Sequence, residues 1–126
     1  MKKLIIISSI LALVIGFGIA ECIFTDTYYN GLSDKLETAQ SLVLENKNDD
    51  ACAVIGEAIS GWEEKKIVIY LIGNHNTAHN LYERIINSYE YLKAGEKSDT
   101  LAYLSSAIFL AREIAREVMP SYGNVF

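Results

Sequence analysis

Two histidines one helical turn apart come closest, by type and spacing, to a chemical site in this chain. His75 and His79 are four residues apart, and Glu83 follows after four more. On a helix this spacing makes the side chains neighbours, and two imidazoles with a carboxylate can bind a divalent metal ion. The zinc-protease motif also needs a glutamate directly after the first histidine as general base, and that position is Asn76. A metalloprotease mechanism is therefore excluded, and a weak metal- or ligand-sensing site is the functional alternative.

The apolar pattern of the same segment predicts how these three side chains face. At about 100° per residue, the apolar side of a helix over residues 75–94 centres about 60° from His75, about 100° from His79 and about 140° from Glu83. The three positions thus turn from the rim of a helix interface into solvent. We predict histidines satisfied by neighbouring groups, with no bound metal and no cofactor.

A second pattern resembles a calcium-binding loop. Asn46, Asn48, Asp50 and Glu57 occupy positions 1, 3, 5 and 12 of such a loop. Position 6, however, is Ala51 where the loop needs glycine, and the residues from Ala51 onward have a helical pattern. We interpret this segment as a turn between two helices.

The cysteines and the possible nucleophiles give no catalytic pattern. Cys22 and Cys52 are the only cysteines, and the expected helices place them about 35 Å apart, against a limit near 7 Å for a disulfide. A thiol near the membrane surface is expected for Cys22, and a bridge between two chains is the alternative. No serine or cysteine lies in a strained glycine-rich turn with a histidine base. We predict that the chain is not an enzyme.

Three aromatic residues are candidates for core packing, partner binding or membrane contact. Trp62, the only tryptophan, ends the apolar stripe of the second expected soluble helix, where it is either a core residue or a partner-binding hot spot. Tyr28 and Tyr29 lie close to the apolar N-terminal segment, and this nearness indicates interfacial anchoring of the first soluble helix.

The first two dozen residues predict a membrane anchor. Residues 4–20 carry no charge, Lys2 and Lys3 precede them, and Glu21 follows. We therefore expect residues 1–24 to cross the cell membrane once, with the N-terminus cytoplasmic and residues 25–126 forming an extracytoplasmic helical domain. A signal peptide cleaved after Ala20 is the alternative.

Beyond the anchor, apolar residues recur at helical spacing and predict an all-α fold. The first soluble helix, over residues 26–46, has a seam of Leu32, Leu36, Ala39 and Val43 and can continue the anchor. A second helix is expected to begin at residue 51, with Asp49 or Asp50 as its cap. Residues 67–72 are also expected to be helical, and Gly73 and Asn74 either end or bend that helix. Two further helices are expected, one over residues 75–94 and one from residue 98 or 99 to Pro120. The expected fold is an N-terminal transmembrane helix followed by a small antiparallel bundle of about four helices.

The net negative charge limits which classes of partner the chain can bind. The formal net charge is −5, and without Lys2 and Lys3 the segment from Glu21 onward carries 9 basic and 16 acidic residues, a charge of −7. We expect no nucleic-acid partner for such a surface, because phosphate binding needs clustered lysine and arginine.

These ordered features resemble one family. The anchor, Trp62, the aliphatic run into His75, the heptad-patterned last helix and the ending Asn124-Val125-Phe126 are similar to the bacterial domain-of-unknown-function family 4363, which consists of small single-anchor membrane proteins. The resemblance spans essentially the whole chain and implies the same topology, without an assigned activity. We expect a protein-interaction or structural module that contacts another envelope protein or a second copy of itself, with Trp62, His75 and Phe126 as interaction residues. A homo-oligomer would use the seam from Leu32 to Val43.

Overall fold

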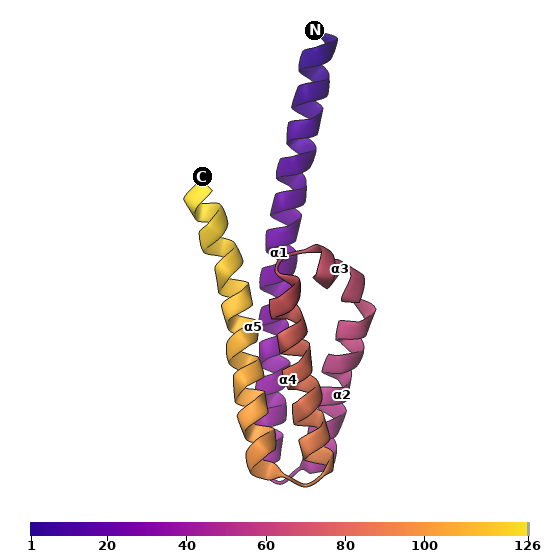
Figure 1. Cartoon of the computed structure of the whole chain (residues 1–126), viewed down its shortest axis with the longest axis vertical. Helices are drawn as coiled ribbons and strands as arrows, with labels where there is room; N and C mark the ends of the chain where they lie inside the picture. The colour runs from indigo at the N-terminus through magenta and orange to yellow at the C-terminus, as the bar shows by residue number, and fades with distance from the viewer. Residues whose placement is uncertain (126) are drawn as a thin grey trace.

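The chain forms one long helix and four shorter ones, with half of the long helix built into a bundle (Figure 1). The computed structural model describes the backbone of residues 1–125 and the side chains of residues 1–117. Residues 1–125 contain five helices and no strand: α1 (Lys2–Leu44), α2 (Asn48–Glu64), α3 (Lys66–Leu71), α4 (His75–Lys93) and α5 (Lys97–Val125). The predicted all-α fold with a long apolar N-terminal helix is confirmed.

Helix α1 has two halves with opposite surroundings. Its 43 residues span about 65 Å at about 1.5 Å per residue. The apolar side chains before Phe24 are exposed, as Leu4 at 71% and Ile23 at 61% show, whereas Thr25 at 2% is the first buried residue. A helix that is apolar on all sides and unburied in its own fold is typical of a membrane span, and α1 is the one described helix long and apolar enough to cross a bilayer.

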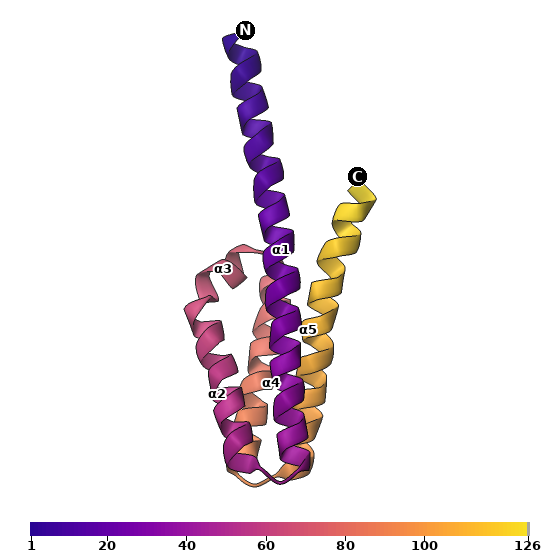
Figure 2. The same cartoon turned by 180° about the vertical axis from the view of Figure 1, so that it is seen from behind.

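The second half of α1 forms a four-helix bundle with α2, α4 and α5. Helix α1 packs against α2 and α5, and α4 packs against the same two helices. Successive long helices run in opposite directions (Figures 1 and 2). Helical spacing brings one stripe of each helix inward, and full burial of a leucine or isoleucine contributes about 1.5–3 kcal/mol. The core consists mainly of Leu32, Leu36, Ala39, Val43, Ala51, Ile55, Ala58, Trp62, Ala78, Leu81, Ile85, Leu92, Leu104, Ala107, Ile108, Ala111 and Ala115.

Two helix ends share one backbone motif. At the end of α1, the N–H of Lys47 donates to the carbonyl of Leu42 at 2.8 Å and Asn46 has a φ of 64°. At the end of α4, the N–H of Glu96 donates to Tyr91 at 2.9 Å and Gly95 has a φ of 79°. This is the Schellman motif, which satisfies the last carbonyls of a helix and needs a residue that tolerates the left-handed region.

The segment between α2 and α4 contains two breaks. Lys65 separates α2 from α3, and Gly73 at φ 81° separates α3 from α4. The side chain of Asn74 then caps α4, because its Oδ1 accepts from the N–H groups of Asn76 at 2.9 Å and Thr77 at 3.2 Å. The open question about this region is settled: residues 66–71 are a separate short helix, and the chain turns at Gly73.

Two expected helix boundaries are wrong. Asp49 or Asp50 was expected as the cap, but α2 already begins at Asn48 and both carboxylates lie in its first turn, where they interact favourably with the helix dipole. Helix α5 was expected to stop at Pro120 and continues to Val125. Proline has a φ close to helical values, so a helix can include it at the loss of one backbone hydrogen bond.

Candidate functional site

The richest cluster of side chains lies at the end of the bundle from which the apolar half of α1 projects. Aromatic rings of α1, α2 and α4 meet there: Tyr28 and Tyr29 lie 6.2 and 6.3 Å from the indole of Trp62, and Trp62 stacks on Tyr82 at 5.6 Å between centroids. Phe24 extends the cluster along α1, since its ring stacks on Tyr28 at 5.5 Å. We call these five residues the aromatic cluster. It joins the last apolar residue of the exposed half to the core.

Burial changes the chemistry of the tyrosines in the cluster. Removal from water raises the pKa of Tyr28 well above its ordinary value and that of Tyr29 to about 12, because the charged phenolate is disfavoured there. For Tyr82 the main cause is a hydrogen bond that its hydroxyl donates to the carboxylate of Glu63, and its pKa is also raised to about 12. These phenols therefore stay protonated at physiological pH and act as packing groups.

A lysine closes the cluster on the side of α3. The ammonium nitrogen of Lys65 lies 5.5 Å from the ring centre of Tyr28 and 6.0 Å from that of Phe24, within the range of a cation–π interaction for both rings. Lys65 is the residue between α2 and α3. The contact thus fixes the start of α3 at the level of Phe24.

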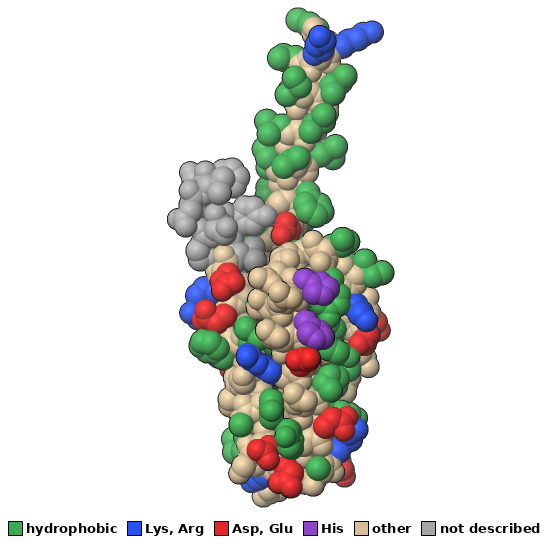
Figure 3. All heavy atoms as spheres, in the orientation of Figure 1, with side chains coloured by type: hydrophobic (Ala, Val, Ile, Leu, Met, Phe, Trp, Pro, Cys, Tyr) green, Lys and Arg blue, Asp and Glu red, His purple; other side chains and the backbone are tan. Residues whose placement is uncertain are grey.

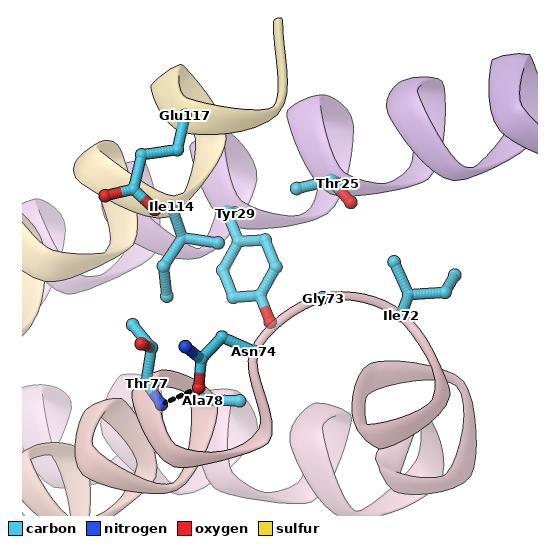
Figure 4. A pocket seen from close by; sticks show the side chains of 9 residues that line it. All are labelled: Thr25, Tyr29, Ile72, Gly73, Asn74, Thr77, Ala78, Ile114 and Glu117. Carbon is cyan, nitrogen blue, oxygen red and sulfur yellow. Dashed lines mark hydrogen bonds between the residues drawn. The ribbon is translucent and has the colours of Figure 1, made fainter. Parts of the chain in front are cut away.

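A small cavity lies beside the cluster, between α1, α5 and the turn that leads into α4 (Figure 4). It encloses about 100 Å³ and its walls include Thr25 and Tyr29 of α1, Gly73 and Asn74 of the turn, and Ile114 of α5. The hydroxyl oxygen of Thr25 is buried and makes no hydrogen bond with the described part of the chain. The cavity holds space for a few water molecules and lacks the size of a site for an organic cofactor.

The two histidines considered as metal candidates, His75 and His79, lie on the surface of α4, next to each other on the face shown in Figure 3. Nε2 of His79 is 3.1 Å from Oε1 of Glu83, and both side chains are more than half exposed. The ring of His75 instead packs on Tyr70 of α3 at 4.4 Å. Both histidines are exposed, as the apolar pattern predicted, and His79 has a carboxylate neighbour while His75 has a ring neighbour. Among the described residues, no three histidine, cysteine, aspartate or glutamate side chains are placed to share a metal ion.

The residues of the calcium-loop pattern also have other contacts. Oδ1 of Asn46 accepts a hydrogen bond from Lys97 at 3.1 Å, and Glu57 lies within α2, where it forms an ion pair with Lys35 at 3.7 Å. The interhelical turn is the correct interpretation of this segment. Cys22 in α1 and Cys52 in α2 are not joined to each other.

Three expectations about interaction residues meet different outcomes. Trp62 is 1% exposed, so the indole is a core residue and reaches a partner only if the bundle opens. His75 is exposed and carries the contact with Tyr70 described above. Phe126 lies outside the described residues.

Two further expectations are corrected. Tyr29, expected at the membrane interface, is 4% exposed, and its ring turns inward onto Trp62. The seam proposed for a homo-oligomer is also internal, because Leu32 is 5% exposed and Leu36, Ala39 and Val43 are fully buried. A stripe of apolar residues shows that one face is covered, but it does not say whether the cover is another copy or the chain's own helices.

Two exposed apolar features are absent from the expectations drawn from the sequence. Phe109 of α5 is 66% exposed, and on α3 Ile67 and Leu71 are 77% and 76% exposed. Phe109 follows the buried Ile108 by a single residue, so its outward direction was readable from the helical period. Residues 67–72 are all apolar, and such a run has no period from which to infer an outward face.

Comparisons of this chain with protein-family models, with curated proteins and with solved structures give no match.

Proposed function

We propose that this chain is a single-pass membrane protein that holds an acidic four-helix bundle outside the cytoplasm and acts by protein contact, without catalysis. The observation that carries the proposal is the continuity of α1. One unbroken helix provides both the exposed apolar segment and a quarter of the bundle. The bundle therefore stands directly on the membrane segment, with no linker between them.

The orientation is supported by charge. Lys2 and Lys3 precede the apolar segment, and the segment from Glu21 onward has a formal charge of −7. Lysines next to a membrane helix favour the cytoplasmic side. The resemblance to family 4363 agrees with this topology and remains a prediction.

Protein contact is supported by the outer surface of α5. Phe109 is exposed on a helix whose other outward groups are small or charged: Ser105 accepts a hydrogen bond from Gln40 at 2.7 Å, and Arg112 pairs with Glu37 of α1. An exposed aromatic ring surrounded by polar groups is the usual form of an interface anchor. A single exposed ring is small, so the contact would be a modest one.

A photo-reactive amino acid at position 109 tests the proposal in intact cells. Asn87, which is also exposed but lies on α4, is the matched control position. We expect an adduct heavier than the chain at position 109 and a weaker one or none at position 87. An adduct of twice the chain's mass would identify the partner as a second copy. Recovery of the chain alone as a monomer from both positions would contradict an interaction role.

A further inference from the structure

Helix α3 has an apolar face that no part of the described chain covers. Ile69 points into the core at 1% exposure, while Ile67 at 77%, Val68 at 40% and Leu71 at 76% point outward. Residues 67 and 71, and residues 68 and 71, are one turn apart on a helix and so share one side. Scattered exposed apolar residues need no explanation, but three on one turn of one helix indicate a contact surface.

Both ends of α3 are fixed at the height where α1 leaves the bundle. At its start, Lys65 contacts the ring of Phe24. At its end, Ile72 and Gly73 share the walls of the small cavity with Thr25. Figures 1 and 2 show α3 at this end of the bundle from both sides.

This height coincides with the edge of a bilayer crossed by α1. From Leu4 to Phe24 the helix rises about 30 Å, which is about the thickness of the hydrocarbon core. Glu21, the first charged residue after Lys3, then lies at the far edge of the hydrocarbon, and Phe24 and Thr25, about one turn further, lie at the level of the lipid headgroups. Helix α3, fixed at that level, lies where headgroups and the first acyl carbons meet.

We infer that the exposed face of α3 rests in the headgroup region of the same bilayer that α1 crosses, with Ile67, Val68 and Leu71 inserted among the lipids. This inference rests on the membrane placement of α1 proposed above.

Two lysines at the start of α3 suit this occupant. Lys65 and Lys66 are exposed and follow the exposed Glu63 and Glu64, of which Glu63 accepts the hydrogen bond of Tyr82. Lysine side chains at this depth bury their methylene stems and bring the ammonium groups to the phosphates of the headgroups. A protein partner would not need to lie at this depth, whereas lipid is present wherever α1 is inserted.

A lipid contact of α3, in addition to the membrane crossing of α1, restricts how the bundle moves relative to the membrane. A single helix lets the bundle rotate about the membrane normal and tilt, while a helix and a separate apolar face together fix which side of the bundle faces the lipid. The surface of α5 around Phe109 is then held in one orientation relative to the membrane.

Depth-dependent fluorescence quenching tests the inference with the full chain. Cys22→Ala and Cys52→Ala remove the native thiols, and single cysteines at Leu71, Leu44 or Leu13 carry a small fluorophore. The labelled proteins are reconstituted into phosphatidylcholine vesicles with about a third phosphatidylglycerol and with lipids brominated near the top of the acyl chain or, for the Leu13 label, near its end. Leu44 is the matched control, because it is apolar and 58% exposed but ends α1 about 30 Å from Phe24.

We expect quenching of the Leu71 label at least about twofold greater than that of the Leu44 label, as for a buried interfacial helix. The Leu13 label reports whether α1 is inserted. Quenching at Leu13 with equal, weak quenching at Leu71 and Leu44 would overturn the inference about α3 and leave the anchor in place. Absence of quenching at Leu13 would overturn the anchor itself. A label at Ile67, on the same face, repeats the measurement, and helical content by circular dichroism verifies that each variant is folded.

Discussion

The indole of Trp62 stacks on the phenol ring of Tyr82 with centroids 5.6 Å apart and planes inclined by 22°. Trp62 belongs to α2 and Tyr82 to α4, so the pair joins two helices of the bundle. The hydroxyl of Tyr82 also returns to α2, where it donates to Glu63. One contact between two side chains thus connects the core with the solvent edge of the aromatic cluster.

Replacement of Trp62 by alanine should strongly destabilise the bundle. The indole is 1% exposed, and removal of a large buried aromatic side chain costs about 3–5 kcal/mol. Unfolding of the detergent-solubilised protein, followed by circular dichroism, measures this loss. Trp62→Phe keeps a ring in the site and should lose clearly less than alanine. A loss below about 1 kcal/mol for Trp62→Ala would show that the indole lies at a surface.

Tyr82→Phe should weaken the fold at neutral pH and less so at alkaline pH. The variant keeps the stacking with Trp62 and loses the hydrogen bond to Glu63, at a cost of about 0.5 kcal/mol for a bond at the solvent edge. The folded-state pKa of Tyr82 is raised to about 12 from 10.0. Its contribution is therefore complete below pH 10 and is lost as the pH rises through 12.

The measurement is the difference in unfolding free energy between the two proteins, taken from about pH 8 to about pH 12. The raised pKa of Tyr29 is common to both and cancels. A difference that stays constant over this range would contradict the link between Tyr82 and Glu63.

Gly31→Ala should stabilise the protein. Gly31 lies within α1 and is exposed, and a Cβ placed there meets no atom within 4 Å. Alanine is favoured over glycine inside a helix by about 1 kcal/mol. Gly73→Ala is the matched control: it also has space, but its φ of 81° should cost about 1–2 kcal/mol. Loss of stability in Gly31→Ala would show that α1 is interrupted at this residue.

Thr25→Val should raise the unfolding free energy by about 1 kcal/mol, because it removes a buried hydroxyl that has no partner in the described chain. Thr100→Val is the matched comparison. Thr100 is also fully buried, but its hydroxyl donates to the carbonyl of Glu96 at 2.7 Å, so we expect a loss of about 1 kcal/mol. Equal losses in the two variants would mean that Thr25 has a hydrogen-bond partner in solution.

The helices and the core could be predicted from periodicity, because one stripe of each helix is apolar. The helix predicted over residues 75–94 is followed by Gly95, which the structure shows as a left-handed residue in a Schellman motif. Asn46 performs the same role, but its polar neighbours Lys47 and Asn48 also fit a simple turn. The continuation of α5 past Pro120 was missed because the rule for proline weighs a lost hydrogen bond without the backbone φ that proline shares with helices.

The candidate site was less predictable, because it depends on how deeply each side chain is buried and on the direction in which it points. Tyr28 and Tyr29 are neighbours in sequence, yet only Tyr29 is fully buried, since consecutive residues on a helix point about 100° apart. The stacking of His75 on Tyr70 and the outward face of α3 depend on the turn at Gly73. The sequence indicated a turn or a bend there without choosing between them.

The most direct test of the account is a fusion of an enzyme that is active only outside the cytoplasm to the C-terminus, after Phe126, assayed in separated membrane and soluble fractions. We expect activity in the membrane fraction, because the proposed function places α1 across the bilayer and the bundle outside the cytoplasm. An inactive fusion would reverse the orientation, and activity in the soluble fraction would show cleavage after Ala20 and the loss of the anchor. Either result would contradict the central claim.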